Sequence, residues 1–245
     1  MAGEKLTSLV VGMGEVGKSL FTVLAGHYDI WAIDLDPKLS FTDEAPETFD
    51  VMHICIRYDE SFEKACKAYV EKYKPTYINV CTTAPVGTTE AVFGPVAVHS
   101  TTRGLHPNLS EGLRKIPKHV GGGLSTFFKS YFELAGIQCV THQKSKTTEL
   151  LHILNNCHYG INLMFANEAA ELCREYGVDY ADWMRYGQTN NEGYIALGHP
   201  SKVRPVLTPP GEKIGGHCVT MSAGLIPQQK RTDMIFNLAK YNDRD

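Results

Sequence analysis

Residues 6–37 read LTSLVVGMGEVGKSLFTVLAGHYDIWAIDLDP, and this stretch decides the fold of the chain. A short β-prone run at 6–11 is followed by a glycine-rich turn, a helical segment and a second apolar run that ends at Asp34. The glycines of the turn stand at G-x-G-x-x-G spacing, at Gly12, Gly14 and Gly17. In such a turn the first glycine permits the tight bend, the second lets the backbone approach a pyrophosphate, and the third lets the helix pack on the strand. The order of these features predicts a dinucleotide-binding βαβ unit.

Two further features of this unit predict which dinucleotide binds. The helix that begins at Glu15 and Val16 offers unpaired N–H groups and a partial positive charge to the phosphates. An acidic residue about 20 positions after the first glycine meets the 2′-hydroxyl of a ribose. Asp34 occupies that position, with Asp36 as the alternative, and a carboxylate there repels a 2′-phosphate. NAD is therefore predicted as the cofactor rather than NADP.

The alternation of strands and helices continues beyond this unit. Strands are expected at 51–58, 76–83, 96–101 and 118–123, and helices at 61–73 and 125–136. This alternation is typical of an α/β fold with a doubly wound parallel Rossmann sheet. Ligands of such sheets bind beyond the carboxyl ends of the strands. We therefore expect cofactor contacts from Arg57, Thr82 and Thr83. Substrate contacts are expected from the loop 103–112, which contains His106.

The second half of the chain loses the strand pattern after 138–142. Residues 146–179 contain no proline and repeat apolar side chains at intervals of three and four, which predicts one long helix. A helix at 180–188, a proline-rich loop at 198–217 and a closing helix at 227–242 are expected to follow. The chain is thus expected to form an NAD-binding Rossmann domain, residues 1–143, and a smaller all-helical domain for substrate binding and dimerisation, residues 144–245. The substrate is expected in the cleft between them, where ligand sites prefer to form.

The composition narrows the classes of partner. A formal net charge of −3, with 21% charged residues, argues against nucleic acid or an anionic membrane as the main partner and favours a small-molecule substrate. No apolar run approaches the roughly 20 residues of a transmembrane helix, and the N-terminus lacks the apolar core of a signal peptide. A cytoplasmic protein is therefore expected. The apolar stripe of the long helix predicts a homodimer, which light scattering would detect.

The cysteines raise a separate question. There are seven, an odd number without a CxxC pair, so a disulfide framework is not expected. Cys55 and Cys81 lie in apolar runs and are expected to be buried strand residues that pack as small hydrophobes. Cys218 follows two glycines and a histidine in GEKIGGHCV, residues 211–219, and is open to three interpretations: a nucleophile, a metal ligand or a small buried residue in a tight turn. No metal site is expected, because neither CxxC nor HExxH occurs.

Four pieces of the chain together resemble the UDP-glucose/GDP-mannose dehydrogenases of the 6-phosphogluconate-dehydrogenase-like superfamily. They are the glycine turn with Asp34, TTAPVGTTE at 82–90, TELLH with NNCHYGINLMFANEAAELCREYGVD at 148–179, and GGHCV at 215–219. The resemblance implies an NAD-dependent oxidoreductase that oxidises an alcohol of a sugar, a sugar derivative or a hydroxy acid. In those enzymes a further nucleotide-binding domain follows the two-domain core, and we expect this chain to lack it.

The resemblance also implies roles for individual residues. Cys218 is expected to capture an aldehyde as a thiohemiacetal, which is then oxidised to a thioester; covalent capture of this kind splits one difficult step into two. Three residues that precede it are expected to line the substrate, namely Gly215, Gly216 and His217. On the long helix, Asn156 is retained one turn after a position where the family has lysine and this chain has His152.

Three departures from the family pattern limit the expected chemistry. His152 replaces the lysine, and Ser222 stands where an acidic residue follows the cysteine. Asn108 is the nearest counterpart of a substrate-loop glutamate, with Glu111 as the alternative. A two-electron oxidation remains, in which Asn156 holds a hydroxyl and His152 removes its proton, since the unperturbed pKa of histidine is about 6.5. The alternative is a catalytically reduced NAD- or ligand-binding module with a role in regulation or assembly.

Overall fold

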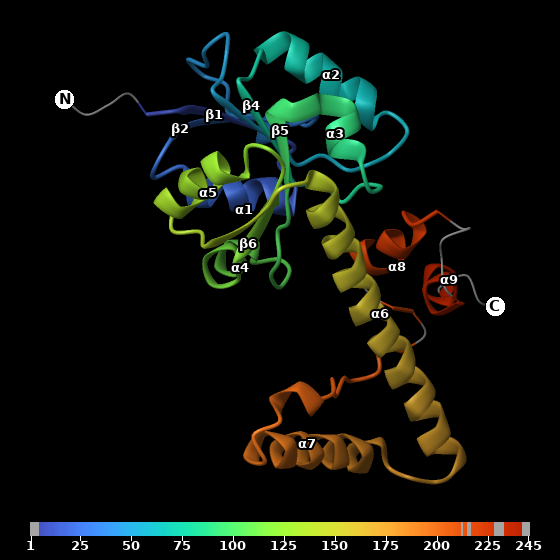
Figure 1. The fold of residues 1–245 in the computed structure, drawn as a ribbon. Helices are drawn as coiled ribbons and strands as arrows, with labels where there is room; N and C mark the ends of the chain where they lie inside the picture. The colour runs from blue at the N-terminus through green and yellow to red at the C-terminus, as the bar shows by residue number, and fades with distance from the viewer. Residues whose placement is uncertain (1–4, 212, 215–216, 228–232, 242–245) are drawn as a thin grey trace. The chain divides into compact units, whose positions relative to one another are not determined.

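A computed structural model describes residues 5–211, 213–214, 217–227 and 233–241 (Figure 1). The chain divides into two compact units, Met1–His152 and Ile153–Asp245. The division falls within the long helix α6, Ser145–Glu175. No helix in the described ranges combines the length and the apolar character that crossing a membrane requires.

The first unit is built on one sheet of seven strands in the part of the chain that the structure describes. In chain order these are β1 Thr7–Val11, β2 Asp29–Ile33, β3 Val51–Ile54, β4 Tyr77–Val80, β5 Ala97–Ser100, β6 Lys118–Gly121 and β7 Cys139–His142. They lie in the order β2-β1-β3-β4-β5-β6-β7, and neighbours run parallel except β5 and β6. The predicted Rossmann-like α/β fold is confirmed.

The direction of β6 corrects the expectation of an all-parallel sheet. β5 and β6 pair antiparallel through His99 with Gly121 and Ser100 with Val120. The segment that joins them contains only the short helix α4, Leu109–Lys115. A parallel neighbour needs a crossover connection over a sheet face, whereas an antiparallel neighbour needs only a return along the same edge. The strands are also shorter than expected, so that Cys55 and Cys81 directly follow β3 and β4 instead of lying within them.

Helices cover both faces of the sheet (Figure 1). On one face α1, Glu15–Leu24, and α5, Ser125–Leu134, pack with α4; on the other lie α2, Phe62–Tyr73, and α3, Thr88–Phe93. The first face buries Leu20, Val23, Leu24, Leu113, Phe128 and Phe132 against Val51, Val98 and Val120. The second buries Phe62 and Cys66 against Leu9, Val11, Met52, Ile54, Ile78 and Val80. Helices α3 and α4 were not predicted, because each begins directly after a turn that contains glycine and proline.

One buried carboxylate joins two of these elements. Glu149, on α6, is 1% exposed and accepts hydrogen bonds from the backbone N–H groups of Gly87 at 2.5 Å and Thr89 at 2.9 Å. The N-cap residue of α3 is Gly87, which has no side chain to satisfy the first N–H groups of that helix. Glu149 takes that role from a distant part of the sequence, and its negative charge suits the positive end of the helix.

The second unit consists of helices in the described ranges. After α6 come α7, Tyr180–Ala196, the 3₁₀ helix η3, Pro200–Lys202, then α8, His217–Gly224, and α9, Asp233–Ala239. α6 ends near Gly177, whose φ of 67° is the left-handed conformation expected at a helix C-terminus. At Gly160 a Cβ atom would stand 2.4 Å from Val219 Cγ1, so only glycine permits this approach of α6 to α8. Helix α8, which contains Cys218, was not predicted from the sequence.

Removing the Glu149 carboxylate tests its capping role. Glu149→Ala leaves two buried N–H groups without an acceptor, and we expect a loss of about 2–4 kcal/mol in the free energy of unfolding, measured by urea denaturation. Glu149→Gln keeps one acceptor oxygen and should lose less. Glu90→Ala, an exposed acidic residue of the same helix, is the control and should change stability by no more than about 0.5 kcal/mol. Equal losses at Glu149 and Glu90 would contradict the assignment.

Candidate functional site

The sheet has its topological switch point at β1. β1 pairs with β2 on one side and with β3 on the other, so the chain leaves in opposite directions from two adjacent carboxyl ends. The N–H of Gly12 donates to Ile33 O at 2.7 Å and that of Cys55 donates to Val11 O at 2.8 Å, which ties the three strand ends together. In open α/β sheets, ligands bind outside the strands at such a point.

The glycine turn has the geometry that its sequence predicts. Gly12 has φ 93°, and a Cβ atom there would lie 2.9 Å from the carbonyl carbon of Cys55. A Cβ atom at Gly17 would stand 1.8 Å from Gly12 O, so the helix packs on the turn only because residue 17 is glycine. At Gly14, the N-cap of α1, no atom lies within 4 Å of that position. The space over the helix N-terminus, where Glu15 and Val16 begin, is open.

Asp34 lies directly after β2 and faces this turn. Its Oδ2 accepts the Met13 N–H at 2.6 Å, and its Oδ1 accepts the Asp36 N–H at 2.9 Å. The backbone N–H groups of Asp36 and then Met13 lower the pKa of the Asp34 carboxyl, against a smaller opposing effect of burial. Asp34 is thus an ionised acceptor beside the turn. Asp36 instead accepts the Lys38 N–H and begins the short helix η1, Pro37–Leu39.

One residue at this edge was not predicted as a candidate site residue. Leu35 follows Asp34 and is 93% exposed, which is unusual for a leucine next to a sheet edge. The available signal was an apolar residue directly after the acidic one, outside the strand pattern. Its side chain offers an apolar surface beside the carboxylate.

The residues after β3 and β4 differ in their exposure and in whether their side chains form hydrogen bonds. Arg57 is exposed. Thr82 is buried, and its hydroxyl donates to Ile56 O at 2.7 Å, so it ties the two strand ends together. Thr83, the next residue, is half-buried. Of these three predicted cofactor contacts, Arg57 and Thr83 have side chains that reach the surface.

The loop between β5 and α4 contacts the start of α1. His106 Nδ1 pairs with Glu15 Oε2, although both side chains remain about half exposed. Asn108 is the N-cap residue of α4 and is exposed. The structure therefore brings one predicted substrate residue together with one predicted cofactor residue, at the N-terminus of the helix expected to hold a pyrophosphate.

Two histidines near the start of α6 have lowered pKa values: His99, which is buried in β5, and His152, which is half-buried in α6. His99 Nδ1 contacts Thr148 Oγ1 at 2.9 Å, and burial lowers the pKa of His99 to about 3. Burial, followed by the charges of Lys118 and Arg103, lowers the pKa of His152 to about 4. His152 Nδ1 is buried without a hydrogen-bond partner among the described residues. His152 is therefore neutral near pH 7 and able to accept a proton.

The remaining predicted residues belong to the second unit. Asn156 donates from Nδ2 to Ser222 Oγ at 2.9 Å, and Ser222 is fully buried. The residue at the family's acidic position thus orients the retained asparagine. Cys218 lies in the first turn of α8 and is half-buried. Gly215, Gly216 and the side chain of His217 lie outside the described residues.

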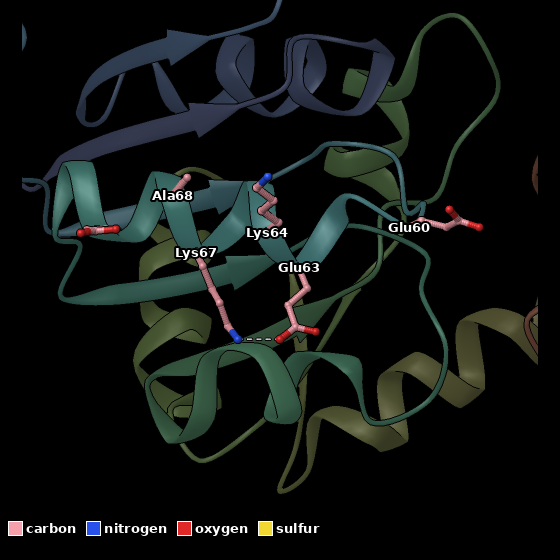
Figure 2. Close-up of a pocket in the computed structure, with 6 residues that line it drawn as sticks. Glu60, Glu63, Lys64, Lys67 and Ala68 are labelled. Atoms are coloured by element: carbon pink, nitrogen blue, oxygen red, sulfur yellow. Dashed lines mark hydrogen bonds and ion pairs between the residues drawn. The ribbon is translucent and has the colours of Figure 1, made fainter.

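Two further observations concern metal binding and the surface of α2. No group of three or more His, Cys, Asp or Glu side chains that could hold a metal ion occurs within the described ranges. Figure 2 shows a shallow hollow along α2, where Glu63 and Lys67 form an exposed ion pair at 2.5 Å. It is lined by Glu60, Glu63, Lys64, Lys67, Ala68 and Glu71. These side chains come from one helix and its start, as expected of a solvated helix face.

Comparison with known proteins places the chain beside dehydrogenases. No protein-family model matches it. A UDP-N-acetyl-D-mannosamine dehydrogenase of Methanocaldococcus jannaschii is 22% identical and is matched over 94% of this chain and 64% of its own length. The predicted resemblance to nucleotide-sugar dehydrogenases is confirmed. The chain spans 64% of the length of this curated relative.

Solved structures show the same fold. The UDP-D-ManNAc dehydrogenase of Pyrococcus horikoshii matches 98% of this chain and 68% of its own, with a TM-score of 0.80 and 18% identity. The 3-hydroxyisobutyrate dehydrogenase of Mycobacterium tuberculosis matches 98% of this chain and 93% of its own, with a TM-score of 0.72 and 15% identity. The fold is thus shared with dehydrogenases of sugar nucleotides and of hydroxy acids.

The buried histidines predict a specific acid sensitivity. In the unfolded chain histidine binds a proton near pH 6.5, whereas folded His99 binds one only near pH 3. The stabilisation is complete above pH 6.5 and is lost as the pH falls below it, by about 1.4 kcal/mol per pH unit for each such residue. His99→Gln should therefore flatten the decline of unfolding free energy between pH 6.5 and 5, measured by urea denaturation. Cys66→Ala, at another buried side chain, controls for destabilisation alone and should leave the slope unchanged.

Proposed function

We propose that the chain is an NAD-dependent oxidoreductase that oxidises an alcohol of a sugar, a sugar derivative or a hydroxy acid. The observation that carries the proposal is the glycine turn with Asp34, where an ionised carboxylate faces an open helix N-terminus at the topological switch point. The similarity to sugar-nucleotide and hydroxy-acid dehydrogenases supports the same reaction class.

The residues present fit NAD. The open space at Gly14 suits a pyrophosphate over the N-terminus of α1. Asp34 would accept a hydrogen bond from a ribose hydroxyl with lone pairs that its two backbone donors leave available, and it would repel a 2′-phosphate. Leu35 offers an apolar surface for a base, and Arg57 and Thr83 lie at the ends of the next strands. When bound, NAD supplies the acceptor for a hydride.

The chain's own residues supply the proton chemistry. We assign proton abstraction from the alcohol to His152, which is a neutral imidazole near pH 7; its pKa of about 4 makes it a weaker base than an unperturbed histidine. Asn156 offers its Oδ1 to a substrate hydroxyl, since its Nδ2 is engaged by Ser222. From the sequence resemblance we propose that Cys218 adds to the aldehyde product as a reversible thiohemiacetal and that Gly215, Gly216 and His217 are substrate contacts. His106 and Asn108 contribute from the β5–α4 loop.

We further propose that the reaction transfers two electrons. A second oxidation would end with attack of water on a thioester, and the family places a carboxylate four residues after the cysteine for that purpose. Here the position holds Ser222, whose hydroxyl already accepts from Asn156. A hydroxyl is a far weaker base than a carboxylate at neutral pH.

Cofactor binding tests the first part of the proposal. Asp34→Asn removes the charge while keeping the shape, and the dissociation constant of NAD, measured by calorimetry, should rise about 10–100-fold. The preference for NAD over NADP should shrink, because the repulsion of a 2′-phosphate is lost. Asp36→Asn is the control and should leave NAD affinity unchanged, since that carboxylate caps η1. Equal affinities in wild type and Asp34→Asn would refute the role of Asp34.

Turnover tests the proposed oxidation of an alcohol. Purified protein would be mixed with NAD and a panel of sugar nucleotides, sugar phosphates and 3-hydroxy acids, with formation of reduced nicotinamide followed by absorbance. We expect one class to react and His152→Ala to slow it about 10²–10⁴-fold. Cys218→Ser with undiminished turnover would remove the covalent role and leave the oxidoreductase standing. NAD binding without turnover of any substrate would favour a ligand-binding module instead.

A further inference from the structure

Two cysteines stand side by side at the carboxyl ends of adjacent strands. Ile54 of β3 is in register with Val80 of β4, and the Cys81 N–H donates to Ile54 O at 2.8 Å, so Cys55 and Cys81 are the next pair in register. Neighbouring strands lie about 4.8 Å apart. A disulfide requires Cα atoms about 4.4–6.8 Å apart with both side chains on the same side. Residues in register on parallel strands meet the second condition.

The two side chains belong to one hydrophobic cluster. Cys55 packs against the buried cluster that contains Cys81, although Cys55 as a residue is only half-buried. Cys81 is 8% exposed and receives a hydrogen bond from Asn79 Nδ2 at 3.1 Å. Ser100 Oγ lies 3.8 Å from the same sulfur. These contacts favour the thiolate form of Cys81, and Cys55 is the thiol in register with it on the next strand.

A buried polar network holds Asn79 in that orientation. Asn79 Oδ1 accepts from Ser100 Oγ at 2.6 Å, and its Nδ2 lies 3.0 Å from His53 Nδ1. His53 Nε2 in turn contacts Tyr131 Oη at 3.0 Å. These groups occupy sheet positions that apolar side chains would otherwise fill, and burying polar groups is tolerated only when they are paired. The proposed dehydrogenase reaction uses none of them.

A buried lysine, Lys118, also affects the Cys81 thiol. Lys118 of β6 is 1% exposed and donates to Thr101 O at 3.0 Å and Thr102 Oγ1 at 3.1 Å, and it forms no ion pair among the residues described. The pKa of the Cys81 thiol is lowered, mainly by the hydrogen bond from Cys55, then by the Lys118 charge and by Ser100 and Asn79. The pKa of the Cys55 thiol is raised by the same pairing and by burial. A thiolate is the form of cysteine that reacts with oxidants.

We propose that Cys55 and Cys81 form a modification site, at which a small peroxide oxidises the pair to an intramolecular disulfide. The Cys81 thiolate attacks one oxygen of hydrogen peroxide, the O–O bond breaks, and the departing hydroxide takes a proton to leave as water. The resulting sulfenic acid on Cys81 is attacked by the sulfur of Cys55, the S–O bond breaks, and a second water leaves. Two thiols lose two electrons and two protons, and the peroxide is reduced to two waters.

The site lies against the glycine turn but does not depend on the proposed reaction. The carbonyl carbon of Cys55 approaches the position of a Gly12 Cβ to within 2.9 Å. Oxidation of the thiols needs neither NAD nor a substrate, and it is detected by mass. The chemistry of the pair and the dehydrogenase activity can therefore fail independently of each other.

Peptide mapping of the wild-type chain tests the proposal. The folded protein would be treated with hydrogen peroxide, alkylated and digested with trypsin without reduction. Trypsin places the relevant cysteines on separate peptides: Cys55 on 39–57, Cys66 on 65–67 and Cys81 on 73–103. We expect a linked pair 39–57 with 73–103 that disappears on reduction, while Cys66 escapes oxidation, because burial raises its pKa to about 12, and is alkylated once the protein is unfolded in urea before digestion.

Variants identify the order of events. In Cys55→Ser, which keeps a hydrogen-bond donor beside Cys81 but cannot form a disulfide, the sulfenic acid on Cys81 should persist and be trapped by dimedone, whereas Cys81→Ala should leave Cys55 reduced at the same peroxide concentration. Cys66→Ala is the matched control and should form the link as the wild type does. Full alkylation of Cys55 and Cys81 after peroxide treatment of the folded wild type would overturn the proposal. Links to Cys66 as frequent as in urea-unfolded protein would overturn it as well.

Discussion

The contact between α1 and the turn that precedes it constrains the whole first unit. A Cβ atom at position 17 would lie only 1.8 Å from Gly12 O, so any residue other than glycine would push the helix away from β1. The close approach aims the N-terminus of α1 at the space above Gly14 and brings Met13 N–H onto the Asp34 carboxylate. β3 then joins β1 on the opposite side from β2, and Cys55 packs against Gly12. The position of the candidate cofactor site follows from this one backbone contact.

Glu149 imposes a second constraint, because it holds together two segments that lie far apart in the sequence. The segments at 82–90 and 148–152 were separate signals in the sequence, and their resemblance to one family gave no reason for their pairing. The structure supplies one, because the carboxylate of the second segment caps the helix that begins in the first. Between them lie β5, β6 and β7, so the pairing is a long-range contact that no local pattern of residues reveals.

The sequence predicted the parts of the fold that local patterns encode. The β1-α1-β2 unit, the long helix and its end near Gly177 depend on glycine spacing and apolar periodicity, which short windows contain. Helices α3, α4 and α8 escaped because each is short and follows glycine or proline, residues that indicate a turn. The direction of β6 escaped because alternation within a strand carries no information about its neighbour. The buried polar network of His53, Asn79 and Ser100 was not predicted, because polar residues in a strand usually indicate a solvent-facing side.

The two departures from the family pattern at positions 152 and 222 share one physical consequence. A lysine at position 152 would carry a positive charge into a region where Lys118 and Arg103 already lower the pKa of His152. A neutral imidazole avoids that repulsion and keeps the capacity to accept a proton. At position 222 a carboxylate would face the Asn156 amide and require further partners in a fully buried place, whereas Ser222 satisfies the amide with one neutral hydrogen bond. Both residues avoid a charge at their position while preserving one hydrogen-bonding function, which is compatible with the single alcohol oxidation proposed above.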